Sequence, residues 1–391
     1  MKKVVCGLLC FTLFMVVLLN CNQTISVNAY SGEIFNNFTS DSYVLLDSDS
    51  GTILVSKNAE EKLPVASICK LMTSLITLEK LDASALDLNT QVLASEHACS
   101  MEGSQAFLDA GSSYSVSELL KSVVVASAND SAVVLSEAIS GSESAFVLEM
   151  NKRAKELGMN NTIYANATGL PAPNQHSTAM DTSIILKEIA KHDLYVKYSN
   201  IWMDTFMHPS GRQTELVNTN RLIKYYSNCK TGKTGFTDEA GYCLASSASN
   251  GNLNLIAVTL KCDKAQDRFK ESMDLYNYGF ANFENKKLID SSVPLTEQIK
   301  VSGGKVNYAN CKFKNDFSVV TKKGTNKKYD IKIDLINSVK APQTMGSKVG
   351  NATIVKDGKV VGEVEIVLAD NLEKQGFKDI LNKMANNWAI N

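Results

Sequence analysis

The stretch Pro64-Val65-Ala66-Ser67-Ile68-Cys69-Lys70-Leu71-Met72-Thr73 holds a lysine inside a run of apolar residues. Pro64 can open a helix, and apolar residues then recur at helical spacing, which predicts a helix buried around most of its circumference. Three residues are just under one turn, so the Ser67 hydroxyl should lie beside the Lys70 amine. Burial disfavours the charged amine, and a neutral amine can take the proton of a serine hydroxyl. The stretch predicts a serine nucleophile with a lysine base.

Composition narrows the alternatives for the whole chain. The 391 residues include 40 Lys+Arg against 41 Asp+Glu and are 44% hydrophobic, which suits one large or two smaller globular domains. Basic residues are scattered, and no nucleic-acid-binding motif is present, so we expect no nucleic acid partner. The four histidines form no His-Glu-x-x-His motif and the cysteines form no Cys-x-x-Cys pair, which argues against a metal site.

Residues 1–29 are typical of an export signal peptide. Lys2 and Lys3 precede an apolar core, Val4 to Leu19, and Val27-Asn28-Ala29 is a small-residue cleavage site. An uncleaved anchor and a lipoprotein attached at Cys21 are the two other readings, the first disfavoured by a short apolar run and the second by Asn20 before the cysteine. We therefore expect export across the cytoplasmic membrane, with the mature protein on the cell-wall side, secreted or peripherally attached to the membrane.

Six cysteines remain after that cleavage: Cys69, Cys99, Cys229, Cys243, Cys262 and Cys311. An even number in an exported protein permits disulfides, but the spacing matches no known framework. We treat them as buried small apolar residues and leave their pairing open.

The first two thirds of the mature chain mix strands and helices. Tyr43–Asp47 and Thr52–Val55 flank a turn with Gly51 and predict a hairpin. Ser115 and Glu118 form a capping box before the helix Leu119–Ala126, and polar residues 127–130 predict a break. Further helices are expected over 131–139, 144–157 and 268–283, with glycines at 141 and 158 ending the first two. Three apolar runs between Cys229 and Leu260, joined by two tight turns, predict an antiparallel meander.

The last hundred residues differ in character. Short β-prone runs separated by turns predict an all-β domain over residues 288–368. Residues 369–391 place Phe377, Ile380, Leu381, Met384 and Trp388 on one helical face, with lysines elsewhere around the helix. This pattern favours a helix lying on a membrane surface, and the alternative is a helix docked on the β domain.

Three short motifs stand in a fixed order: Ser67-x-x-Lys70, Ser127-Ala128-Asn129 and Lys233-Thr234-Gly235. The first is expected at a helix start, the second between helices and the third on a strand. Ser-x-x-Lys alone occurs by chance in most proteins of this length, and each motif alone could be structural. Their joint order on those element types is specific.

With these motifs the sequence resembles the serine-type D-alanyl-D-alanine carboxypeptidases, the low-molecular-weight penicillin-binding proteins of the peptidase S11 family. Thr168-Gly169-Leu170, Lys233 to Thr237 and Ala240-Gly241 add to the resemblance, which covers nearly all of the mature chain. It implies an α/β (α+β) transpeptidase fold like that of penicillin-binding proteins and β-lactamases, with an antiparallel sheet and a helical subdomain. The catalytic domain would span residues 30–287, followed by the C-terminal all-β domain.

The resemblance also implies roles for the motif residues. Ser67 would attack the carbonyl of the penultimate D-alanine and form an acyl-enzyme, with Lys70 as the base. Ser127 would relay a proton to the leaving amine, and Asn129 would contact the substrate backbone. Lys233 would keep positive potential over the site and help keep Lys70 neutral.

The remaining family roles concern the substrate's carboxylate and the oxyanion. Thr234 and Arg268 are candidates to bind the terminal carboxylate, although Arg268 could equally be a surface residue at a helix start. Gly235 belongs to the same substrate-binding strand, and the backbone N–H groups of Ser67 and Phe236 would form the oxyanion hole. Cys69 between the serine and the lysine, and Ala167 where family members often carry proline, depart from the family pattern without touching this chemistry.

The function implied is removal of the terminal D-alanine from peptidoglycan pentapeptide stems, with β-lactam antibiotics as covalent inhibitors and no cofactor. A serine β-lactamase is the first alternative; class A enzymes of that kind also carry a Glu-x-x-Leu-Asn motif, and none occurs between Asn129 and Lys233. A non-catalytic wall-binding or β-lactam-sensing protein is the second alternative, against which the intact motif residues argue.

Overall fold

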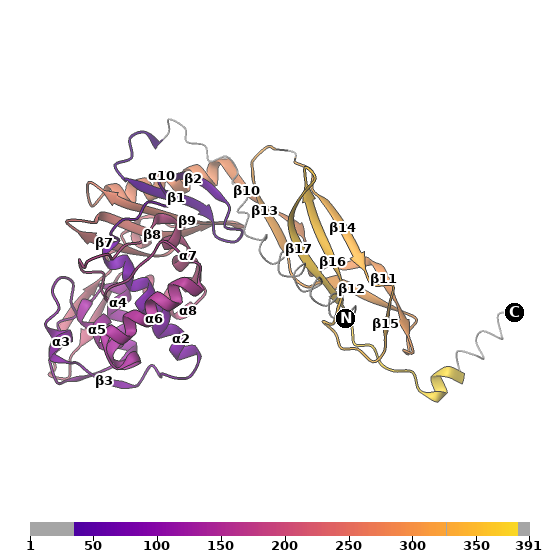
Figure 1. The fold of residues 1–391 in the computed structure, drawn as a ribbon, viewed down its shortest axis with the longest axis horizontal. Helices are drawn as coiled ribbons and strands as arrows, with labels where there is room; N and C mark the ends of the chain where they lie inside the picture. Colours follow the sequence, from indigo (N-terminus) through magenta and orange to yellow (C-terminus); the bar gives the residue numbers. More distant parts are fainter. Residues whose placement is uncertain (1–34, 326, 382–391) are drawn as a thin grey trace, which may run out of the picture. The chain divides into compact units, whose positions relative to one another are not determined.

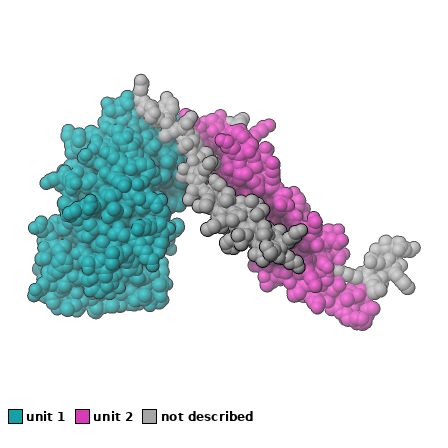
Figure 2. Space-filling model, in the orientation of Figure 1, with its two compact units in different colours: residues 1–282 teal, residues 283–391 magenta. Residues whose placement is uncertain are grey.

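The computed structural model describes residues 35–325 and 327–381. The chain divides into two compact units, residues 1–282 and residues 283–391 (Figure 2). The expected leader at residues 1–29 and the last part of the expected amphipathic helix, residues 382–391, lie outside the described residues.

A five-stranded antiparallel sheet with the order β2-β1-β9-β8-β7 is the frame of the first unit (Figure 1). Its strands are β1 (Ser42–Asp47), β2 (Ile53–Lys57), β7 (Cys229–Thr237), β8 (Gly241–Asn250) and β9 (Leu253–Cys262). Successive side chains point to opposite faces of a strand. Val44 and Leu46 accordingly join the large core cluster, whereas Leu45 packs toward Gly279 on the other face. The expected hairpin and meander are both confirmed.

Some of the helices of this unit cover the two faces of the sheet (Figure 1). The remaining helices form a separate helical layer. Helix α2 lies within that layer and is buried from Lys70 to Leu78, as its apolar pattern predicts. The helices are α2 (Lys70–Asp82), α3 (Glu96–Cys99), α4 (Val116–Val125), α5 (Asn129–Ser140), α6 (Glu143–Glu156), α7 (Ala179–Ile189), α8 (Asp193–Ser199), α9 (Leu222–Tyr225) and α10 (Asp267–Asn282). Two small hairpins pair β3 (Gln91–Leu93) with β4 (Ser113–Ser115) and β5 (Met203–Met207) with β6 (Gln213–Val217).

The helix ends follow the predicted chemistry. The Ser115 hydroxyl accepts a hydrogen bond from the Glu118 N–H and caps α4, and Gly141 ends α5 with a φ of +79°. One end differs from expectation: the segment after Pro64 begins as a single 3₁₀ turn, η2 (Ala66–Cys69), and α2 starts only at Lys70. The φ of Ala66 is +47°, which a regular α-helix cannot contain, so the helix does not extend back to Pro64.

The second unit contains the expected all-β domain. A six-stranded sheet has the order β14-β16-β17-β12-β11-β15, and β10 pairs with β13. Ala352, Ile354 and Ile366 are fully buried in its core cluster. The strands are β10 (Phe283–Ile289), β11 (Pro294–Ser302), β12 (Tyr308–Phe313), β13 (Phe317–Lys322), β14 (Asp330–Leu335), β15 (Ser338–Lys340), β16 (Lys348–Lys356) and β17 (Lys359–Leu368).

Candidate active site

The predicted nucleophile and base are in direct contact. Ser67 lies in η2, and Lys70 is the first residue of α2. Lys70 Nζ lies 2.8 Å from Ser67 Oγ and donates a hydrogen bond to the Thr168 carbonyl at 2.6 Å. The Lys70 side chain is fully buried while Ser67 is partly exposed. A substrate can therefore reach the hydroxyl while the amine remains shielded from water.

Burial gives Lys70 the protonation behaviour of a base. It is the main cause that lowers the pKa of Lys70 to about 7, with Cys69 and Asp130 acting in the opposite direction. A large share of the amine is then neutral near pH 7, where an exposed lysine would be charged.

The charge repulsion between the two lysines acts on Lys233, whereas we expected it to act on Lys70. Its pKa lies well below the usual lysine value, first because it is buried and then because Lys70 and Arg268 are close. For Lys70 itself, burial is what lowers the pKa. The expected help from Lys233 in keeping Lys70 neutral stays a prediction.

Ser127 and Asn129 come from the break between α4 and α5. Ser127 has a φ of +65°, a left-handed conformation that few non-glycine residues adopt, and its Oγ accepts a hydrogen bond from Lys233 Nζ at 2.7 Å. Asn129 opens α5 and donates from Nδ2 to the Glu102 carbonyl at 2.5 Å. The buried Oδ1 of Asn129 has no hydrogen-bond partner among the described residues, so it can accept an N–H from a bound peptide.

Asp130 holds the chain segment next to the start of α5 in place through hydrogen bonds. Its carboxylate accepts hydrogen bonds from the backbone N–H groups of Ala106 and Leu108, at 3.0 and 3.1 Å, and it is fully buried. The segment that contains Gly103 and Ser104 is thereby held against the start of α5.

The Lys-Thr-Gly motif lies on β7, at the edge of the sheet. The Thr234 hydroxyl donates to the Thr219 hydroxyl at 2.6 Å. A β-carbon on Gly235 would lie only 2.4 Å from the Val65 carbonyl oxygen, so a glycine is needed where β7 passes the segment before the nucleophile.

Arg268 reaches the site from the first turn of α10. Its Nη1 donates to the Gly235 carbonyl at 3.0 Å, and its buried Nε has no partner among the described residues. It is one of the lining residues of a cleft of about 390 Å³. That cleft is lined by Ser67, Gly103, Ser104, Ser127, Asn129, Gly169, Leu170, Thr219, Thr234, Gly235, Phe236, Thr237 and Arg268, none of which is acidic.

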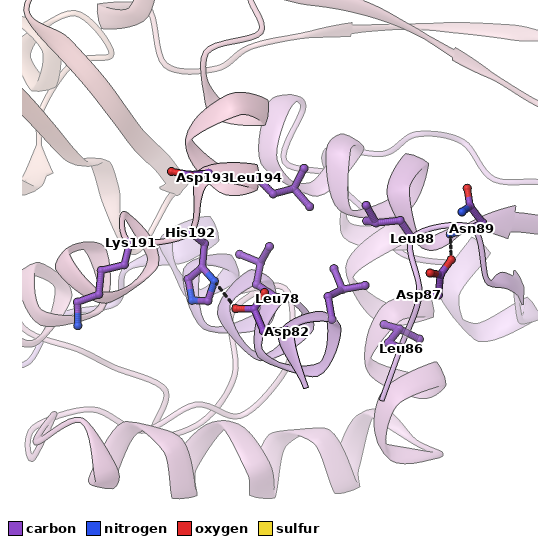
Figure 3. Close-up of a pocket in the computed structure, with 11 residues that line it drawn as sticks. Leu78, Asp82, Leu86, Asp87, Leu88, Asn89, Lys191, His192, Asp193 and Leu194 are labelled. Carbon is purple, nitrogen blue, oxygen red and sulfur yellow. Dashed lines mark hydrogen bonds and ion pairs between the residues drawn. The ribbon is translucent and has the colours of Figure 1, made fainter. Parts of the chain in front are cut away.

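A larger hollow of about 560 Å³ lies at the other end of α2, around Leu78, Asp82 and His192 (Figure 3). Its polar side chains include those of His192 and Asp82, whose Nδ1 and Oδ2 atoms lie 3.1 Å apart. Twelve helical residues, about 18 Å, separate its Asp82 from Lys70. It contains none of the motif residues, so size alone does not locate the reactive site.

The structure brings Ser67, Lys70, Ser127, Asn129, Lys233, Thr234, Gly235, Phe236 and Arg268 to one cleft and its immediate surroundings. Sequence reasoning missed two contributors: the Thr168 carbonyl that contacts Lys70, and Thr219 beside Thr234. Thr168 belongs to a short stretch that carries the family resemblance, whereas nothing in the sequence around Thr219 indicates its place. No cluster of metal-ligating side chains occurs within the described ranges.

Comparison with known proteins decides the family. A family model described as D-alanyl-D-alanine carboxypeptidase matches residues 28–264, and a model described as penicillin-binding protein 5, C-terminal domain, matches residues 283–374. The chain belongs to the D-alanyl-D-alanine carboxypeptidase family. It is a serine hydrolase of that family, and its C-terminal all-β domain is of the penicillin-binding protein 5 type.

Full-length relatives agree with this assignment. D-alanyl-D-alanine carboxypeptidase DacF of Bacillus subtilis is 37% identical over 89% of both chains, and DacC of Escherichia coli is 33% identical over 86% of this chain and 84% of its own. Among solved structures, penicillin-binding protein 5 of Haemophilus influenzae has a TM-score of 0.72 and 30% identity, covering 86% of this chain and 98% of its own. The expected fold class is confirmed by these similarities.

Proposed function

We propose that this carboxypeptidase removes the terminal D-alanine from peptidoglycan pentapeptide stems through an acyl-enzyme on Ser67. The contact between Ser67 and Lys70, with the amine buried, carries the proposal. It supplies an activated serine at neutral pH, which hydrolysis through a covalent intermediate requires.

Acylation follows from the positions of three side chains. Neutral Lys70 takes the proton of Ser67 as Oγ attacks the carbonyl of the penultimate D-alanine. The backbone N–H groups of Ser67 and Phe236 stabilise the oxyanion. The C–N bond then breaks, and the proton that Lys70 took from Ser67 passes to the leaving D-alanine amine through the hydroxyl of Ser127, which Lys233 contacts. Water afterwards hydrolyses the ester and frees Ser67.

The charge of the cleft matches a substrate that ends in a carboxylate. Arg268 contributes positive charge, and none of the residues that line the cleft is Asp or Glu. The hydroxyl of Thr234 and the guanidinium of Arg268 are the groups that we assign to the terminal carboxylate.

The same observation disfavours the β-lactamase alternative. A class A β-lactamase needs a carboxylate in the cleft to activate the deacylating water, and the lining residues of this cleft supply none. We expect β-lactams to acylate Ser67 and to act as covalent inhibitors.

The test is intact-mass spectrometry of residues 30–391 after mixing with benzylpenicillin, together with D-alanine release from a pentapeptide. We expect a lasting one-to-one adduct and D-alanine release, both absent in folded Ser67→Ala. An adduct that survives this substitution would refute the assignment of Ser67, and rapid drug hydrolysis without an adduct would favour the β-lactamase.

We further propose that residues 1–29 direct export and that the catalytic domain occupies residues 30–282, because β10 (Phe283–Ile289) belongs to the second unit. Residues 369–376 are not helical and Leu372 is buried in the core of the β domain, so the membrane helix is shorter than expected. We propose that residues 377–391 attach the protein to a membrane surface at the wall side. No helix among residues 35–325 and 327–381 is long and apolar enough to span a bilayer. Phe377 and Leu381 are 77% and 50% exposed, which supports a surface contact. Sedimentation with phosphatidylglycerol vesicles should be lost in Phe377→Asp/Leu381→Asp; unchanged binding would refute this attachment.

A further inference from the structure

A second hollow, of about 520 Å³, adjoins one end of the catalytic cleft. Leu170 lines the cleft and Pro171 lines the hollow; on the other wall, Thr237 lines the cleft and Glu239 lines the hollow. Two chain segments therefore run from the cleft directly into this hollow. Its lining residues are Lys62, Pro64, Pro171, Ala172, Pro173, Asn174, Gln175, His176 and Glu239.

The proposed substrate pose points the upstream part of the stem peptide toward this hollow. With the terminal carboxylate at Thr234 and the scissile carbonyl at Ser67, the preceding residues leave the cleft away from Thr234. Along β7 that direction runs through Phe236 to Thr237. A strand advances about 3.3 Å per residue, so Thr237 is about 10 Å from Thr234, which equals the reach of three extended peptide residues. The third residue from the substrate's C-terminus then lies level with Thr237 and Glu239.

Two of the residues that line this hollow carry side chains of opposite charge. Lys62 and Glu239 are both exposed. Neither side chain forms an ion pair or a hydrogen bond with any part of the chain that the structure describes. A ligand that carries both an ammonium and a carboxylate could engage both.

The wall formed by residues 170–176 is held in place before any ligand arrives. Gln175 accepts hydrogen bonds from the N–H groups of Ala165 and Asn166 and donates to the Leu170 carbonyl, at 2.9, 3.2 and 2.8 Å. Because this wall is ordered in advance, a ligand need not supply the free energy to order it.

We propose that this hollow binds the diamino acid that precedes the two D-alanines of the stem. Glu239 pairs with its side-chain ammonium, and Lys62 pairs with a carboxylate on the same side chain, as in a diaminopimelate-type residue. The inference rests on the proposed function and assigns that site a preference for one class of stem.

The first test compares Nα-acetyl-L-Lys-D-Ala-D-Ala with its Nα,Nε-diacetyl form, in which the ammonium is blocked. We expect the intact enzyme to have a kcat/KM about two- to fivefold higher for the free amine, the range for an exposed ion pair. Glu239→Gln should bring this ratio near one. Asp238→Asn, one residue away and outside the hollow, should leave the ratio unchanged.

The second test addresses Lys62 with pentapeptides whose meso-diaminopimelate side-chain carboxylate is free or amidated. Lys62→Gln should remove a preference for the free carboxylate. Lys264→Gln, which changes an exposed lysine that does not line the hollow, should preserve it. A ratio near one in the intact enzyme for both substrate pairs, or ratios that the two hollow variants leave unchanged, would overturn the proposal.

These outcomes are separable from failure of the proposed function. If the diacetyl tripeptide is hydrolysed and benzylpenicillin forms its adduct, the catalytic assignment stands and only the subsite is in question. If neither occurs in the folded protein, the proposed function fails first, and the subsite proposal fails with it.

Discussion

The carbonyl oxygen of Ala66 lies 2.0 Å from the point that a β-carbon on Gly169 would occupy. Gly169 also has a φ of +82°, which disfavours any other residue. Gly235 approaches the carbonyl oxygen of the preceding residue, Val65, in the same way. The two residues before the nucleophile are therefore confined between two glycines, and Ser67 takes its position from that confinement.

Gly169→Ala should consequently impair both stability and chemistry. Left-handed strain of about 1–2 kcal/mol adds to an overpacking cost of about 1–3 kcal/mol. We expect a melting temperature lower by about 6 °C or more and benzylpenicillin acylation slower by about 100-fold, because the nucleophile is displaced.

Gly111→Ala is the matched control for this change. Gly111 has a φ of +75° but no atom within 4 Å of the added carbon, so this variant carries the strain without the clash. It should acylate at the rate of the unmodified enzyme. If the two variants behave alike, the close approach to Ala66 is not what requires Gly169.

The pH dependence of the acylation rate should follow the protonation state of Lys70. The base acts when it is neutral, and its pKa is lowered to about 7, so the rate should rise about tenfold per pH unit below 7 and level off above it. Stopped-flow acylation by benzylpenicillin from pH 5 to 9 measures this. A rate that keeps rising through pH 9 would show that Lys70 has an ordinary lysine pKa.

Asp130→Asn should change stability and this pH profile together. Two buried N–H groups, of Ala106 and Leu108, would face an amide in place of a carboxylate, at a cost of about 1–3 kcal/mol for each lost acceptor. Since the Asp130 charge raises the pKa of Lys70, its removal should move the acidic limb to lower pH. Asp238→Asn, at an exposed aspartate, is the control. If the acidic limb of the Asp130→Asn profile stays at the same pH, the charge of Asp130 does not influence the pKa of Lys70.

Local signals in the sequence were sufficient for much of the fold. Two apolar runs on either side of the turn at Gly51 predicted the first hairpin, and the capping box at Ser115 predicted the start of α4. The three motifs predicted which side chains would meet, because their order and element types occur together in one family.

Long-range contacts were not predictable in this way. The Thr168 carbonyl reaches Lys70 across 98 residues, and a backbone oxygen has no signature in the sequence. The left-handed φ of Ala66 is likewise imposed by tertiary packing, since alanine alone favours a helix. The hairpin of β5 and β6 was missed because its few apolar residues alternate with polar ones over only five positions per strand.

Asn166 offers a test of how the base is oriented. Its Oδ1 accepts hydrogen bonds from the Thr168 N–H, the Thr168 hydroxyl and the Gly169 N–H, at 3.2, 3.1 and 2.7 Å, and its Nδ2 donates to the Leu170 carbonyl at 2.9 Å. These bonds fix the carbonyl that accepts an N–H of Lys70, and this contact orients the single lone pair of the neutral amine toward Ser67.

Asn166→Ala should therefore lower the plateau rate of acylation by about tenfold, as expected for a misoriented base. Asn166→Asp keeps the acceptors and should recover part of the plateau, but its added negative charge should raise the pKa of Lys70 and move the acidic limb to higher pH. Asn161→Ala, which removes a solvent-exposed hydrogen bond to Glu60, serves as the control and should change neither. If the Ala and Asp variants have the same plateau rate and the same position of the acidic limb, Asn166 serves only to hold its own chain segment in place. A purely structural role would not distinguish a charged side chain from a missing one.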